Sequence, residues 1–446
     1  MPDRGLRAVS TSLERIDENK PLLQRKGSRG SRLDDKDFIV GGSTIYQTVF
    51  NSVNILMGIG ILSLPLGFAY AGWLLGGLLF FASGAVTLYT ALLLSRCMAD
   101  RPELQTYADV AYAAFGTKAR YYVSLAFSME LLASCTALVV LFGDGLHSLM
   151  PSITATQFKL MGFFLFFGSS FVPLSILSIS SIVGILATSS VVFVVIADGF
   201  IKHTSPGSLL QPAHTDWLPQ KLGLTPLAIG LMMSPWSAHS VFCNVYKDMR
   251  HPHKFGKAIK TSYGITSILD IAMAVSGYLM FGNAVMDEIT QSILGTEGYP
   301  QLISVLIVVM ISIVPLTKMP LNTRPIATTV DVLLGVDDRV VKAHTAGSSI
   351  LTRSSIRFGV RVLVNGIPVI LGIFCPSFDR VMSLLGSGLC YTICVLLPVA
   401  FYLKLCGHKI GTGERMSLYV IWVFALLLGC LGTVWTFLPR ELIEGL

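Results

Sequence analysis

The chain has 446 residues, of which 52% are hydrophobic and only 13% are charged, and its formal net charge is +7. Its mean hydropathy is +0.67. So few ionised side chains cannot cover the surface of a water-soluble protein of this length, and the composition therefore excludes an ordinary soluble domain and predicts an integral membrane protein. The positive charge is accounted for below by loop topology, so we expect no nucleic-acid partner.

The first 40 residues are polar and mix basic with acidic side chains. A segment of this composition cannot bury enough apolar surface to fold alone, so we expect residues 1–40 to form a disordered cytosolic tail. The first apolar run is too long for the hydrophobic region of a signal peptide and is expected to remain as an anchor. Residues 41–446 are then expected to form one transmembrane domain.

Apolar stretches long enough to cross a bilayer recur from Ile45 onward. The boundary between the fourth and fifth stretches, near Ser178, is the least marked because no charge separates them. The stretches predict an all-α membrane protein of eleven helices, at about 45–70, 73–96, 121–145, 158–177, 181–201, 223–246, 257–281, 300–330, 357–374, 379–403 and 416–437.

Lysine and arginine are concentrated in alternate loops, as they are in the cytosolic loops of membrane proteins. One set of loops holds Arg96, Arg101, Lys118, Arg120, Lys247, Arg250, Lys254, Lys257, Lys260, Arg339, Lys342, Arg353, Arg357, Arg361, Lys404, Lys409 and Arg415. The opposite set holds only Lys159, Lys202, Lys221, Arg380 and Arg440. This asymmetry predicts a cytosolic N-terminus and a C-terminus on the other side of the membrane.

Two of the predicted spans carry helix-breaking residues near their midpoints. In the first, Gly58 and Gly60 each cost about 1 kcal/mol relative to alanine in a helix interior. In the sixth, Pro235 removes a backbone donor and clashes with the preceding turn. Interrupted spans at corresponding positions predict two inverted repeats of five helices, at about 44–201 and 223–403, followed by an eleventh helix at about 416–437. The alternative is that these residues only allow close helix packing or kinking.

Such breaks suit a zwitterionic ligand. A half-helix that begins near Ile59 and Gly60 presents unpaired N–H groups to a carboxylate, whereas freed carbonyls near Asn54 and Ser234 can accept from an ammonium group. This chemistry favours amino acids over sugars and inorganic ions. Trp236 either bounds the side-chain pocket or packs in the core. The predicted substrate-binding residues are Asn54, Gly58, Ile59, Gly60, Ser234, Pro235, Trp236 and Ser237.

The segment FNSVNILMGIGILSLPLGFAYAGW resembles the first helix of the amino acid/auxin permease family. Further likeness lies in MELLASCTALVVLFGDGL, SPWSAHSVFCNVYKDM, HPHKFGKAIK, GYLMFG and VPLTKMPLNTRPI, and the nearest resemblance is to fungal vacuolar amino acid transporters. The resemblance implies an eleven-helix fold of the leucine-transporter type. It also implies that mainly neutral amino acids enter an acidic vacuole in exchange for protons.

Ionisable residues inside predicted spans are costly, at about 2.5 to 3.5 kcal/mol near the bilayer centre, and therefore indicate function. Glu130 in the third span is the first candidate for the group that carries the proton, Asp270 in the seventh is the second, and His239 after the second break could also titrate. Lys318 and Arg324 in the eighth span are expected to be structural charge partners. Glu130, Asp270 and backbone carbonyls are their possible acceptors. The alternative for the acids is a structural ion pair, and for His239 a hydrogen bond to a carbonyl.

The choice between protons and sodium depends on two positions of the family pattern. In sodium-coupled relatives, an asparagine in the first helix and a threonine in the eighth help to hold the ion. Asn54 matches the first position, but Ile313 stands at the second, with Ser312 beside it. An isoleucine side chain cannot coordinate a hard cation, which requires oxygen ligands. Protons are therefore favoured over sodium, and the alternative is a weak sodium site built from Ser312 and backbone carbonyls.

Three function classes remain: a proton-coupled or sodium-coupled transporter, a non-transporting amino acid sensor of the same fold, and a membrane enzyme. No paired His/Asp cluster of a membrane enzyme is found, so we expect a transporter without catalytic activity, cofactor or metal. Gly58-Ile-Gly60 lacks the third glycine and the soluble strand of a dinucleotide fingerprint. The expected partners are the amino acid, protons and the lipid bilayer, and the expected location is the vacuolar membrane.

Overall fold

The computed structural model describes residues 42–171, 174–334, 336, 350–375 and 377–444. The predicted tail at residues 1–40 lies outside them. Within the described residues the secondary structure is helical, apart from one isolated parallel bridge between Ser43 and Met249. The predicted all-α class is confirmed for this part of the chain.

The first half of the chain folds into a series of helices, and the first membrane segment is interrupted between Leu56 and Ile59. Its elements are α2 (Ile45–Leu56), η2 (Ile59–Ser63), α3 (Leu64–Asp100), α4 (Tyr107–Phe115), α5 (Thr117–Leu149), α6 (Ala155–Ser169) and α7 (Leu174–Ile201). α2 begins with a capping box in which Thr44 and Gln47 satisfy each other's backbone N–H groups.

The second half also begins with an interrupted segment, in which the helix breaks between Met233 and His239. Its elements are η3 (Leu222–Leu224), α8 (Thr225–Met233), η4 (Ser234–Trp236), α9 (His239–Asp248), η5 (Pro252–Lys254), α10 (Phe255–Phe281), η6 (Gly282–Ala284), α11 (Ile289–Leu294), α12 (Gln301–Leu333), α14 (Ile350–Phe374), α15 (Phe378–Leu384), η7 (Leu385–Leu396, a π-helix), α16 (Leu397–Cys406), η8 (Gly407–Lys409), α17 (Thr412–Thr436) and α18 (Arg440–Glu444).

Eight described helical stretches are long and apolar enough to cross a membrane. The first of them, Ile59–Asp100, joins part of the first predicted span to the second, and a kink at Gly72 (φ 70°) divides it. The remaining predicted spans correspond to α6, which has 15 residues, and to the interrupted segments that contain α2, α8 and α9. The count of eleven spans therefore stays a prediction.

The boundary predicted near Ser178 is wrong. α6 ends at Ser169 and α7 begins at Leu174, so Ser178 lies inside α7. The stronger signal in the sequence is Pro173, because proline cannot continue a helix and is favoured at the start of one.

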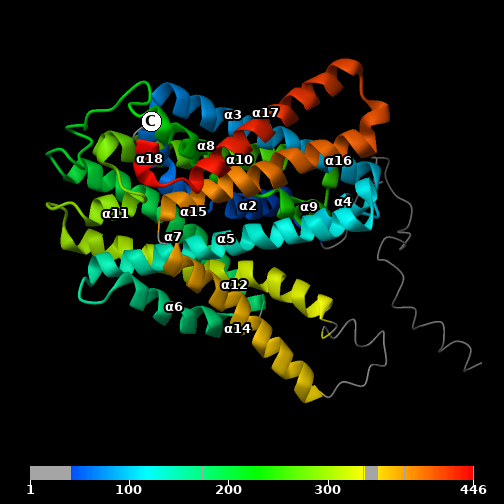
Figure 1. Cartoon of the computed structure of the whole chain (residues 1–446), viewed down its shortest axis with the longest axis horizontal. Helices are drawn as coiled ribbons and strands as arrows, with labels where there is room; N and C mark the ends of the chain where they lie inside the picture. Colours follow the sequence, from blue (N-terminus) through cyan, green and yellow to red (C-terminus); the bar gives the residue numbers. More distant parts are fainter. Residues whose placement is uncertain (1–41, 172–173, 335, 337–349, 376, 445–446) are drawn as a thin grey trace, which may run out of the picture.

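The helices run roughly along the long axis of the molecule (Figure 1). α4, α9 and α16 lie toward one end, and α11 and α18 lie toward the other. α12 packs between α5 and α7, and α3 packs on α8 and α10. The most apolar window of α17 is only 22% buried, against 61% for the stretch Phe378–Lys409, so α17 lies at the periphery. Exposed apolar side chains such as Leu427 on α17 are available for lipid contact.

Candidate functional site

The first predicted interruption is present. α2 ends at Leu56, Met57 leaves the helical region, and Gly58 is extended (φ −83°, ψ −171°). The chain then resumes as η2, which runs directly into α3. The Met57 N–H closes the last α-helical bond, to the Val53 carbonyl oxygen, whereas the Gly58 N–H donates to the Leu56 carbonyl oxygen at 2.7 Å, outside the α-helical pattern.

The second predicted interruption is also present. α8 ends at Met233, a 3₁₀ turn covers Ser234–Trp236, and Ser237 is extended (φ −79°, ψ 99°) before α9 begins at His239. Pro235 stands in the first turn of the 3₁₀ segment, where a backbone N–H has no helical partner, so proline costs no hydrogen bond there.

The two interruptions touch each other. A Cβ atom added at Gly60 would lie 2.7 Å from Ser234 Oγ and 3.1 Å from Pro235 N. Real Cβ atoms essentially never approach another heavy atom as closely as the first of these distances. Glycine at position 60 thus lets the two breaks pack directly against each other.

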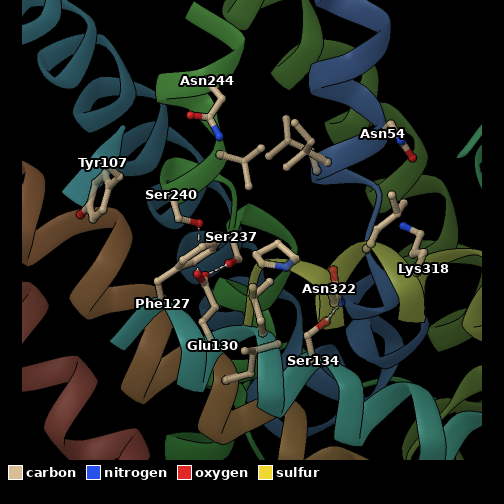
Figure 2. Close-up of a pocket in the computed structure, with 18 of the residues that line it drawn as sticks. Asn54, Tyr107, Phe127, Glu130, Ser134, Ser237, Ser240, Asn244, Lys318 and Asn322 are labelled. Atoms are coloured by element: carbon tan, nitrogen blue, oxygen red, sulfur yellow. Dashed lines mark hydrogen bonds between the residues drawn. The ribbon is translucent and has the colours of Figure 1, made fainter. Parts of the chain in front are cut away.

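A cavity of about 670 Å³ begins at this contact and extends to α4 and α9 (Figure 2). Of the eight predicted substrate-binding residues, seven line it: Asn54, Gly58, Ile59, Gly60, Ser234, Pro235 and Ser237. Asn51 and Asn244 line it farther from the breaks and are exposed, so the cavity opens at the end of the bundle that carries α4.

The eighth residue, Trp236, does not line this cavity. Its side chain is 1% exposed and is stacked on Tyr263, with ring centroids 5.3 Å apart, and it also packs on Phe80. A Cβ at Gly84 would approach the same ring to 3.0 Å. The placement matches core packing between α3 and α10.

Replacing Trp236 is therefore expected to change stability and not selectivity. Trp236→Ala should lower the free energy of unfolding by about 3 to 5 kcal/mol, as removal of a large buried ring does. Trp236→Phe should keep the order of substrate preference, because the ring is outside the cavity. Thermal unfolding in detergent and substrate competition measure the two effects. A changed preference order in Trp236→Phe would place the ring in the binding site.

Glu130 connects α5 to the second break. Its Oε1 accepts a hydrogen bond from Ser237 Oγ, and its Oε2 accepts one from Ser240 Oγ at 3.2 Å (Figure 2). The side chain lines the cavity, although the residue is only 5% exposed. A carboxylate with both oxygens on one break will change the contacts of that break when it gains a proton.

The two other predicted proton-coupling residues lie away from the cavity. Asp270 on α10 is 3% exposed and forms no hydrogen bond or ion pair with another described residue. His239 is fully buried, and its Nε2 lies 3.0 Å from the Thr87 carbonyl oxygen and 3.0 Å from Thr90 Oγ1. His239 thus joins the start of α9 to α3.

The cations of α12 differ in position. Lys318 lines the cavity and its Nζ donates to the Met57 carbonyl oxygen at the end of α2. Lys318 therefore contacts a backbone carbonyl, one of the three kinds of acceptor expected for it. Arg324 lies farther along α12, half-buried, and does not line the cavity. Figure 2 shows Lys318 and Glu130 on opposite sides of the pocket.

Several polar lining residues were not predicted. They are Asn51, Thr106, Tyr107, Ser124, Ser134, Ser240, Asn244, Asp248, Asn322 and Thr329. Ser240 could have been found because it follows Ser237 by only three residues in the sequence. Asn322 donates to Ser134 Oγ at 3.0 Å. It lies between Pro320 and Pro325 of α12, and two prolines in one span indicate a functional segment less clearly than the short distance between Ser237 and Ser240 does.

A charge cluster lies toward the other end of the bundle. Arg440 Nη2 is 3.1 Å from Asp379 Oδ2 and 3.4 Å from Asp287 Oδ1, and Tyr70 donates to Asp379 Oδ2 at 3.4 Å. Burial, together with the Asp379 carboxylate, raises the pKa of Asp287 to about 7, so this carboxyl still holds its proton in mildly acidic solution. The cluster ties α3, α15 and α18 to the segment before α11.

A family model described as "Transmembrane amino acid transporter protein" matches residues 41–438. Amino acid transporter AVT1C of Arabidopsis thaliana is 30% identical over 433 residues, which cover 93% of this chain and 74% of that protein. Amino acid transporter AVT1B of the same plant is 31% identical over 425 residues, with coverage of 92% and 74%. The family resemblance expected from the sequence motifs is confirmed.

Two solved transporters share the fold at low identity. A substrate-bound, outward-open Na⁺-coupled sialic acid symporter has a TM-score of 0.55 and 13% identity, covering 90% of each chain. MHP1, a nucleobase-cation-symport-1 family transporter in a closed conformation with bound bromovinylhydantoin, has a TM-score of 0.54 and 10% identity, covering 92% of this chain and 93% of that one. Both have the leucine-transporter type of fold.

Proposed function

Because this chain belongs to the amino acid/auxin permease family, whose model is described as a transmembrane amino acid transporter protein, we propose that it is a proton-coupled carrier of mainly neutral amino acids. The observation that carries this proposal is the cavity at the contact between the two helix breaks. Backbone groups of the two breaks are proposed to supply the partial charges that a zwitterion requires, at a site lined by α2, α5, α9 and α12.

The cavity lining supports a substrate without net charge. Near the breaks its charged side chains are Glu130 and Lys318, among neutral serine and asparagine side chains, and a second carboxyl, Asp248, lines it at the exposed end of α9. The Glu130 carboxyl is already bonded to two hydroxyls and the Lys318 ammonium to a carbonyl. A substrate with an extra charge held at the breaks would therefore lack a free counter-ion there, and leaving such a charge unpaired is costly.

Glu130 is proposed as the coupling group, in preference to Asp270 and His239. It is the one of the three that lines the cavity and bonds to a break. A protonated carboxyl has one fewer acceptor site and becomes a donor, so Ser237 and Ser240 must change their hydrogen bonds when the proton arrives. Substrate binding and proton binding would then act on the same segment of backbone.

The proposed orientation follows from loop charge. The cavity opens at the end of the bundle where Arg101 follows α3 and Lys247 stands in the last turn of α9. Basic loops favour the cytosolic side, so the structure is proposed to face the cytosol, with the C-terminus in the lumen. The resemblance to fungal vacuolar transporters supports antiport of amino acid and protons at the vacuolar membrane.

The test is uptake by the purified full chain in liposomes with an imposed pH gradient. A labelled neutral amino acid should accumulate against its gradient, and a competition panel should rank neutral above charged amino acids. Accumulation driven by a sodium gradient without a pH gradient would favour the sodium symporter. Saturable binding without accumulation under either gradient would favour the sensor and contradict the proposal.

A further inference from the structure

The Lys318 ammonium lies where the first helix break leaves a carbonyl outside the helical ladder. Its Nζ donates to the oxygen of Met57, the residue that ends α2. The carboxyl end of a helix carries partial negative charge, and a cation is favourable there. This contact therefore places a full positive charge at the negative end of α2, on one wall of the cavity.

No described carboxylate forms an ion pair with Lys318, and Glu130 is bonded instead to Ser237 and Ser240. Lys318 is also only half-buried, with its accessible part facing the cavity. A purely structural cation at membrane depth would be expected to have an acid beside it, because pairing is the usual fate of such charges.

The position of Lys318 on α12 is set by helical spacing. Ile311 and Val314 line a small cavity of about 10 Å³ together with Gly58 and Ile59. Lys318 follows Val314 by four residues and therefore projects from the same face of α12, one turn nearer the open end of the main cavity. This face of α12 lies against the first break, and Lys318 brings a charge from it to the backbone there.

We propose that Lys318 is a built-in cation that holds the carbonyl end of α2 in the way a bound alkali-metal ion would, so that transport requires no sodium or potassium. The inference rests on the proposed transport function and adds the residue that determines ion specificity. A covalently attached ammonium supplies the charge and the hydrogen-bond donor at this carbonyl without being released. Ile313, five residues earlier on α12, has no side-chain oxygen to offer a metal ion.

Two measurements on Lys318→Ala test the proposal, with Lys318→Arg as the control that keeps the charge. In wild-type liposomes, uptake should be the same in sodium, potassium or N-methylglucamine buffer. Lys318→Ala should lose about tenfold in uptake, the effect of removing one hydrogen bond from a charged donor, and n-propylammonium should restore part of it where n-propanol does not. Thermal unfolding supplies a readout independent of transport: n-propylammonium or sodium should raise the Tm of Lys318→Ala but not that of the wild type.

The outcomes separate this inference from the proposed function. If the wild type accumulates no amino acid, the transport proposal fails, whereas the Tm measurement still decides the role of Lys318. If Lys318→Ala transports like the wild type in N-methylglucamine buffer, or if cations leave its Tm unchanged, the inference is wrong. A loss confined to substrate affinity, without cation rescue, would instead assign the ammonium to the substrate carboxylate and overturn the proposal.

Discussion

Glu130→Gln is expected to abolish accumulation of amino acid driven by a pH gradient while exchange of labelled for unlabelled substrate continues. Glutamine has nearly the same shape and can still contact Ser237 and Ser240, but it cannot release a proton. The variant should therefore bind substrate and cross between states while it is uncoupled from pH. Accumulation under a pH gradient and exchange at equal pH, measured on the same liposomes, separate the two activities, and the ratio between them should fall by about tenfold or more.

The matched control is Asp270→Asn, which removes another buried carboxyl from a membrane helix. Asp270 does not line the cavity, so this variant should keep its response to the pH gradient. Glu130→Asp, which retains a carboxyl on a shorter side chain, should keep part of the coupling. If Asp270→Asn is uncoupled and Glu130→Gln is not, the coupling role belongs to Asp270. If both variants behave like the wild type, neither acid carries the proton.

Gly60→Ala is expected to reduce uptake by about tenfold or more, because the added methyl group forces the two helix breaks apart. Its Cβ would lie 2.7 Å from Ser234 Oγ, and Pro235 N at 3.1 Å leaves little room for movement. Overpacking of this kind typically costs about 1 to 3 kcal/mol, and here the strain falls on the proposed binding site itself. The uptake rate, the substrate affinity and the Tm should all decrease together.

Two further variants show whether this contact is the cause. Gly77→Ala on α3 adds the same methyl group where no atom lies within 4 Å, and it should behave like the wild type. The double variant Gly60→Ala with Ser234→Ala removes the nearest clashing atom and should recover part of the activity. A fully active Gly60→Ala single variant would show that the two breaks need not touch during transport.

The positions of both helix breaks could be predicted from the sequence because they depend on local chemistry. Gly58, Gly60 and Pro235 each disfavour a continuous helix whatever surrounds them, and the structure is interrupted at these residues. The apolar lengths of the long helices follow from composition in the same way. Glu130 could be singled out because an acid in an apolar span is rare on energetic grounds.

Side-chain direction could not be predicted, because it depends on how distant helices pack. Trp236 directly follows cavity-lining Pro235 in the chain, yet its ring turns toward Tyr263 and away from the cavity. Lys318 donates to the Met57 carbonyl oxygen, 261 positions away in the sequence. This carbonyl is available only because α2 ends there. Tyr107 lines the cavity from α4, a short helix that no apolar run in the sequence indicated.

The contacts of Arg440 have a practical consequence for probes. This residue, from the last described helix, bridges Asp379 and Asp287. A fluorescent protein or affinity tag fused behind α18 would be attached directly to this helix. Arg440 on α18 must break its contacts with Asp379 and Asp287 if this end of the bundle is to open. Reporters intended to follow conformational change without disturbing it are therefore better attached elsewhere than behind α18.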